Sequence, residues 1–157
     1  MEFHNIEPVF NENSKILILG SFPSVKSREQ KFFYGHPQNR FWRVISSITN
    51  ETLPSTIEEK KILLLKHNIA VWDVIKSCDI IGSSDSSIDN VCINDFSVIF
   101  NKANIRHIYA NGDKAYSLFK KYYSKDVDIV KLPSTSPANA QYTLERLCEE
   151  WSVIKNI

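Results

Sequence analysis

The chain has 157 residues, of which 43% are hydrophobic and 24% are charged, and its formal net charge is +1. This composition is typical of a globular protein with one buried core, and we expect a single domain over residues 1–157. No apolar run is long enough for a membrane-spanning helix, and the first residues lack the basic and apolar regions of a signal peptide. We therefore expect a cytoplasmic protein.

The expected elements alternate between short apolar runs and longer segments of helical periodicity. In chain order they are a strand at 15–20, helices at 39–50 and 54–68, a strand at 69–75, a helix at 94–104, a strand at 105–112, a helix at 112–123, a strand at 127–133 and a helix at 140–157. Such alternation favours a parallel sheet with helices on both faces. We predict a three-layer α/β/α fold around a central parallel four-stranded sheet.

The polar segments that follow the expected strands are the least core-like parts of the sequence. They are GSFPS (20–24) with GHPQNRFW (35–42), WDVIKSCDIIGSSDSS (72–87), NGDK (111–114) and LPSTSPANA (132–140). In open parallel sheets, ligands bind at the carboxyl ends of the strands. We therefore expect these segments to converge on one cleft, and we expect the Ser-rich stretch 77–87 to be a loop.

Two of these loops have the residue types that bind phosphate or approach a ligand closely. GSFPS combines Gly20 with the hydroxyls of Ser21 and Ser24, but it is neither a Walker loop nor a G-x-G-x-x-G motif, so a nucleotide cofactor is disfavoured. LPSTSPANA places Ser134 and Ser136 before the last helix, where hydroxyls and backbone N–H groups suit phosphate oxygens.

Positive charge is concentrated between Lys26 and Arg43. That stretch has five basic residues against the single acid Glu29, a net +4 that leaves −3 for the remainder of the chain. It also contains the aromatic segment FFYGHPQNRFW (32–42). A basic face with aromatic side chains is typical of nucleic-acid binding, and the alternative is an ordinary solvated surface.

The cysteines Cys78, Cys92 and Cys148 are far apart and form no C-x-x-C motif. Their spacing favours buried thiols over a disulfide framework or an iron–sulfur site. We expect no metal, no cofactor and no membrane partner, and we expect a monomer.

Taken together, GSFPS, YGHPQNRFW, WDVI, NG-KA and LPSTSPAN resemble the uracil-DNA glycosylase superfamily, and within it the hypoxanthine-DNA (deoxyinosine) glycosylase family. The resemblance runs from about Gly20 to Asn139. Two positions depart from the superfamily's pattern: Ser21 follows Gly20 where an acidic or amide residue is usual, and Leu132 replaces the histidine that commonly opens the second loop. The resemblance implies that Asn39 takes over the catalytic water and that the enzyme is metal-free.

A base in DNA can be excised only after its nucleotide leaves the stack, so the protein must hold the base, the phosphates and a water. The expected catalytic residue is Asn39, which would orient the water through its amide oxygen. The base-binding candidates are Ser21, Phe22, Tyr34, His36, Asp73 and Asn111. The DNA-phosphate candidates are Ser24, Lys31, Arg40, Ser134 and Ser136.

Several of these side chains also have a purely structural interpretation. Asn39 stands where an N-cap belongs, and asparagine is among the best caps. His36 suits a turn before Pro37, Asp73 suits a loop cap, and Asn111 suits an Asx-turn.

The sequence predicts a monofunctional DNA glycosylase that hydrolyses the N-glycosidic bond of deaminated bases, most of all hypoxanthine. The alternatives are a uracil-DNA glycosylase of broad specificity and a non-catalytic nucleotide- or phosphate-binding α/β module.

Overall fold

A computed structural model describes residues 1–155 of the chain. Its centre is a four-stranded sheet in the order β3 (Ile69–Asp73), β2 (Ile16–Gly20), β6 (His107–Asn111), β7 (Val130–Leu132). All three pairings are parallel, which confirms the predicted central sheet. Every residue of β2 and β3 is buried, because both strands are covered on their two faces.

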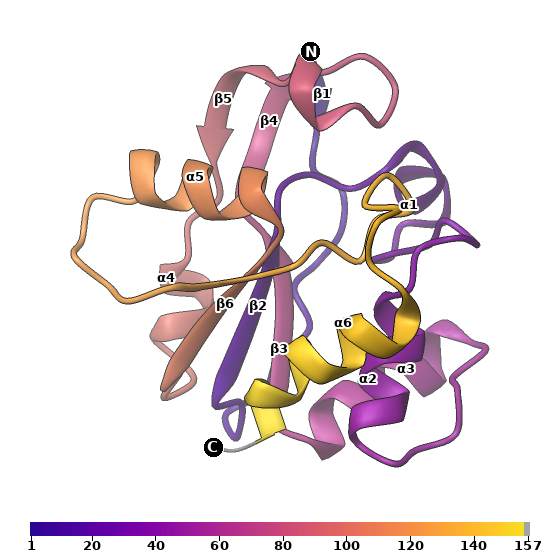
Figure 1. Ribbon diagram of the computed structural model, residues 1–157. Coiled ribbons are helices and arrows are strands. Elements are labelled where there is room, and N and C mark those ends of the chain that lie inside the picture. Colours follow the sequence, from indigo (N-terminus) through magenta and orange to yellow (C-terminus); the bar gives the residue numbers. More distant parts are fainter. Residues whose placement is uncertain (156–157) are drawn as a thin grey trace.

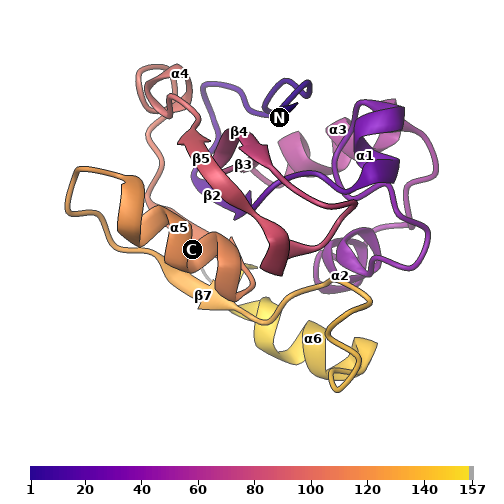
Figure 2. The same cartoon turned by 90° about the horizontal axis from the view of Figure 1, so that it is seen from above.

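Helices cover both faces of this sheet (Figures 1 and 2). One face has α4 (Ser97–Phe100) and α5 (Asp113–Tyr122). The other has α1 (Val25–Gln30), α2 (Phe41–Ile48), α3 (Ile57–Lys66) and α6 (Leu144–Trp151). This arrangement confirms the three-layer prediction, and the apolar side chains of all layers form one buried cluster.

A second, antiparallel sheet was not predicted. It has the order β1 (Glu2–Phe3), β4 (Ile75–Asp79), β5 (Asp89–Ile93), and it extends beyond the carboxyl end of β3 (Figure 1). The expected strand 69–75 therefore ends at Asp73, and the stretch 77–87 begins as a strand rather than a loop. The apolar run hid the break because Val74, at the break, and Ile75, which begins β4, are both fully buried.

Most predicted helices are present with shorter bounds. Thr56 caps α3 by accepting a hydrogen bond from the Glu59 N–H at 3.0 Å. The segment 94–104 yields only α4, and the last helix ends at Trp151 before a 3₁₀ turn, Ser152–Lys155. A second 3₁₀ turn, Asp85–Ser87, connects β4 to β5. The final two residues of the predicted helix 140–157 lie outside the described residues.

No helix among residues 1–155 is long and apolar enough to cross a membrane.

Trp151 ties the last helix to one of the polar loops. Its side chain is fully buried, its ring meets Phe41 edge-on at 6.0 Å, and its Nε1–H donates to the Pro133 carbonyl at 2.9 Å. The indole therefore joins α6, α2 and the start of the loop after β7.

We expect Trp151→Ala to lower the free energy of unfolding by about 3–5 kcal/mol, because it leaves a large cavity. Trp151→Phe keeps one buried aromatic ring but loses the N–H donor and part of the indole volume, so it should cost less, about 1–3 kcal/mol. Val153→Ala, at a position 43% exposed, is the control and should change stability by less than about 0.5 kcal/mol. Urea denaturation of the three variants tests this order, and equal costs for Ala and Phe would contradict it.

Candidate active site

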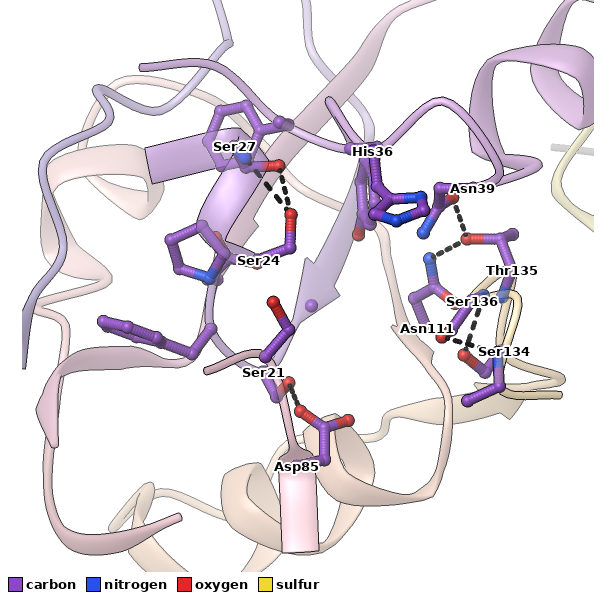
Figure 3. A pocket seen from close by; sticks show the side chains of 18 of the residues that line it. Ser21, Ser24, Ser27, His36, Asn39, Asp85, Asn111, Ser134, Thr135 and Ser136 are labelled. Carbon is purple, nitrogen blue, oxygen red and sulfur yellow. Dashed lines mark hydrogen bonds between the residues drawn. The ribbon is translucent and has the colours of Figure 1, made fainter. Parts of the chain in front are cut away.

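One cavity of about 340 Å³ lies at the carboxyl ends of β2, β3 and β6 (Figure 3). The four polar segments of the sequence all contribute to its wall, as the parallel topology requires. It is lined by every predicted site residue except Lys31 and Arg40, namely Ser21, Phe22, Ser24, Tyr34, His36, Asn39, Asp73, Asn111, Ser134 and Ser136.

A chain of hydrogen bonds joins three segments at one side of the cavity (Figure 3). The Thr135 hydroxyl donates to Asn39 Oδ1 at 2.8 Å and accepts from Asn111 Nδ2 at 3.0 Å. The Thr135 N–H donates to Asn111 Oδ1 at 3.0 Å, and the Phe41 N–H donates to Asn39 Oδ1 at 2.9 Å. Asn111 therefore binds the loop after β7 to β6, and it makes no Asx-turn to Gly112.

These bonds fix the orientation of both amides. A backbone N–H can only donate, so the atoms facing Phe41 and Thr135 must be the oxygens of Asn39 and Asn111. Asn39 Oδ1 thus accepts two hydrogen bonds and has no lone pair left for a water. The expected contact through the amide oxygen is therefore wrong, and the Asn39 NH₂ group is the part turned to the cavity (Figure 3).

Asn39 also stabilises the start of α2, though one residue from the predicted position. Arg40 is the N-cap, and the Val44 N–H donates to its carbonyl at 2.9 Å. The Asn39 side chain caps from the preceding position through the Phe41 N–H. The structural and functional interpretations of this residue are compatible, because they use opposite ends of the amide.

Gly20 is required where β2 meets the cavity. A Cβ at this position would collide with Asp73 Oδ1 and lie 3.0 Å from Tyr34 Oη. Tyr34 has a φ of 52°, a left-handed conformation that a bulky side chain adopts only when the surroundings hold it there. Its ring stacks on Phe41 at 4.0 Å.

The phenol of Tyr34 remains protonated. Burial, with the Asp73 carboxylate nearby, raises the pKa of Tyr34 far above its usual range. Its hydroxyl has no hydrogen-bond partner among residues 1–155.

Asp73 is only 3% exposed, yet its carboxylate lines the cavity. Its Oδ2 lies 2.8 Å from Nε2 of His4, which the N-terminal strand β1 brings beside β4. The Ile6 N–H donates to the other ring nitrogen, His4 Nδ1, at 3.3 Å. Nε2 must therefore be the protonated nitrogen that donates to Asp73. Asp73 Oδ1 accepts no hydrogen bond from the described residues.

A second carboxyl group, Asp85, reaches the cavity from the loop between β4 and β5. The Ser21 hydroxyl donates to Asp85 Oδ1 at 2.8 Å (Figure 3). The residue is open to the cavity, but surrounding protein displaces part of the water around its carboxyl group. This desolvation raises the pKa of Asp85. The loop is held over the cavity by the Ser83 hydroxyl, which accepts from the Val25 N–H at 2.9 Å.

The predicted phosphate-binding serines also organise their own loops. Ser24 caps α1 by accepting from the Ser27 N–H at 3.2 Å. Ser134 accepts from the Ser136 N–H at 3.1 Å, and Ser136 accepts from the Ala138 N–H at 3.2 Å. Each hydroxyl accepts in these turns, and those of Ser134 and Ser136 keep their hydrogens free to donate into the cavity.

His36 combines a turn with a position on the cavity wall (Figure 3). Its Nδ1 accepts from the Gln38 N–H at 3.1 Å, so its Nε2 carries a hydrogen. Phe22 is 8% exposed, with the Arg28 guanidinium 5.3 Å above its ring.

Arg40 does not line the cavity, because its guanidinium holds the loop after β7. It donates to the carbonyls of Ser136 at 2.9 Å and Asn139 at 3.1 Å, and also to the carbonyl of Tyr142. The guanidinium thus clamps the protein's own backbone, and the expected phosphate contact of Arg40 stays a prediction.

The rest of the basic stretch is divided in the same way. Lys31 lines a separate groove together with Phe32 and Lys61. Arg28 donates to the Gly82 carbonyl at 2.6 Å and pairs with Glu2 at 3.4 Å. Lys26, Lys31 and Arg43 remain exposed.

Sequence reasoning missed His4, Asp85 and Thr135 as parts of the site. His4 is far from the motifs along the chain, and Asp85 lies in the polar segment 72–87 but beyond WDVI. The unpredicted second sheet places His4 behind Asp73, and its β4–β5 connection brings Asp85 to the cavity. Thr135 lies inside a motif, and its central place in the hydrogen-bond chain depends on its complete burial. No group of three metal-ligating side chains occurs in the described part of the chain.

Comparisons with known proteins agree with this geometry. The family model described as the uracil DNA glycosylase superfamily matches residues 7–156. A Methanosarcina acetivorans protein named hypoxanthine DNA glycosylase is 39% identical over 148 residues, 93% of each chain. A Methanosarcina barkeri protein of the same name is 39% identical over 117 residues, 73% of this chain and 74% of the relative.

A solved structure is similar as well. The solution NMR structure of a Methanosarcina acetivorans protein, provisionally named a uracil DNA glycosylase, has a TM-score of 0.81 and 35% sequence identity. The match covers 96% of this chain and 94% of that chain.

We expect Arg40→Ala to lower the free energy of unfolding by about 2–3 kcal/mol, because it removes charge-assisted hydrogen bonds to the backbone. Arg43→Ala, on the exposed side of α2, is the matched control and should leave stability nearly unchanged. Thermal melting measures both. A stable Arg40→Ala protein whose DNA affinity has a salt slope lower by about one would restore the phosphate contact.

Proposed function

The chain belongs to the uracil DNA glycosylase superfamily, and we propose that it is a monofunctional DNA glycosylase that removes deaminated bases, hypoxanthine in preference to uracil. Both curated relatives are named hypoxanthine DNA glycosylase. The DNA substrate would be bound with one nucleotide turned out of the duplex, because the cavity is too small for stacked base pairs.

The observation that carries this proposal is the pairing of two groups in one cavity. Asp73 Oδ1 offers an acceptor, and the Asn39 NH₂ group offers donors on a separate element. A carboxylate oxygen suits the ring N–H that deamination creates at N1 of hypoxanthine, and that uracil has at N3. Tyr34, stacked on Phe41, gives the base an aromatic surface.

The reaction is hydrolysis by water at C1′ of the sugar. As the C1′–N bond breaks, its electron pair leaves with the base, and the sugar gains positive charge. The water oxygen bonds to C1′ and loses a proton, and the base takes up a proton as it departs. The Nε2–H of His36 is proposed to donate to the base or to a phosphate, since Nδ1 accepts from the Gln38 N–H.

Asn39 positions the water by donating from Nδ2 to the water oxygen, which leaves one lone pair for attack at C1′. A neutral amide is a poor base, so its contribution is placement rather than proton transfer. The hydroxyls of Ser134 and Ser136 at the cavity wall are proposed to donate to the phosphates that flank the extruded nucleotide, whereas the Ser24 hydroxyl already donates to Ser27 Oγ at 3.1 Å.

We expect hypoxanthine release to exceed uracil release from otherwise identical duplex oligonucleotides under single-turnover conditions. The expected difference is at least tenfold, roughly 1.4 kcal/mol in the barrier. Uracil release faster by the same factor would establish the broad-specificity alternative. Release of neither base, with the protein folded and DNA bound, would overturn the glycosylase assignment.

The roles of the two ends of the Asn39 amide can be separated. Asn39→Asp keeps an oxygen for Phe41 and Thr135 but removes the NH₂ donors, so we expect a wild-type melting temperature and excision slower by about tenfold or more. Asn39→Ala loses both ends. It should cost about 1 kcal/mol of stability and slow excision by about a hundredfold or more.

Single-turnover excision with saturating enzyme, measured alongside thermal melting, tests both variants. Wild-type excision by a folded Asn39→Ala protein would reduce this residue to a cap. Wild-type excision by Asn39→Asp would show that the NH₂ donors are not needed.

A further inference from the structure

We propose that His4 is a positioning residue that fixes Asp73 as a hydrogen-bond acceptor and thereby sets the preference for bases with a ring N–H. This inference rests on the function proposed above and concerns how the same cavity selects its base. His4 itself contacts no base in this scheme, and it acts through Asp73.

Two hydrogen bonds, each donated in a known direction, connect the backbone of Ile6 through His4 to Asp73 at the cavity. The Ile6 N–H is an obligatory donor to His4 Nδ1, at 3.3 Å, so the imidazole must donate from Nε2 to Asp73 Oδ2, at 2.8 Å. With Oδ2 so engaged, Oδ1 is the oxygen left to the cavity, and it can only accept.

The packing holds this arrangement in place. The side chains of His4 and Asp73 are 3% and 5% exposed, and the imidazole lies among Phe22, Phe33 and Trp72 with ring centroids 6.1–6.3 Å away. The backbone N–H of His4 donates to the carbonyl of Lys76 at 2.7 Å, and this bond anchors His4 to β4. A ring enclosed in this way cannot rotate to offer the other nitrogen.

The consequence is selection against bases whose ring nitrogen is an acceptor. Hypoxanthine has N1–H, whereas adenine and unsubstituted purine have a bare N1 that would face the Asp73 oxygen with a lone pair. A site built to accept a hydrogen bond discriminates strongly against ligands that cannot donate it, because its own polar atom is then left unpaired.

The test compares two amides that differ in reach. His4→Gln can place its NH₂ group near the position of Nε2 and donate to Asp73. His4→Asn ends near the position of Nδ1, so it can accept from Ile6 but cannot reach Asp73. Each variant is assayed in single turnover on duplexes that contain deoxyinosine or deoxynebularine, whose base is unsubstituted purine. His107→Asn, an exposed position on β6 outside the cavity lining, is the control.

We expect His4→Asn to lose about tenfold or more of the ratio of hypoxanthine to purine excision, His4→Gln to keep that ratio within about threefold, and His107→Asn to match the wild type. Equal ratios for His4→Asn and wild type would overturn the role of His4. Equal losses in the Asn and Gln variants would also overturn it, since they would indicate a merely structural residue. A wild-type protein that releases neither base would instead reject the proposed function itself.

Discussion

The wall of the candidate active-site cavity is organised by the hydrogen bonds that Thr135 makes to Asn39 and Asn111. These three residues belong to segments far apart in the sequence, and their side-chain bonds join the loop after β7 to β6 and to the start of α2. Because the threonine is fully buried, each bond is shielded from competing water. The same bonds orient the Asn39 amide, so the geometry of the cavity and its chemistry have one physical origin.

Two further anchors keep this loop in one conformation. The Arg40 guanidinium holds the carbonyls of Ser136 and Asn139, and the Trp151 indole holds that of Pro133. Backbone carbonyls left unpaired near a buried site would be costly, and these donors satisfy them. The loop is thus held by hydrogen bonds at several points, as the proposed positioning of a water by a neutral amide requires.

The second sheet contributes differently: it adds a hydrogen-bond partner for Asp73, which belongs to β3, and a second carboxyl group, Asp85, at the cavity. Through β1 it places His4 behind Asp73, and through the β4–β5 connection it places Asp85 beside Ser21. The two carboxyl groups differ in surroundings. Asp73 is buried and held by an imidazole, whereas Asp85 is open to the cavity and held by a hydroxyl. A departing base leaves positive charge on the sugar, and a cavity with negative potential favours that charge.

The sequence by itself determined the central parallel sheet, because β2 and β3 are fully buried apolar runs and the runs of β6 and β7 are also rich in branched or aromatic residues. It also determined which loops meet, since parallel strands place their carboxyl ends together. Only the tertiary structure decided the second sheet, whose strands β1 and β5 are short and largely exposed and so have little apolar pattern. It likewise decided that the Arg40 side chain donates to backbone carbonyls and that the nitrogen of the Asn39 amide faces the cavity. Those outcomes depend on which donors and acceptors meet across the fold, and residue type alone does not specify them.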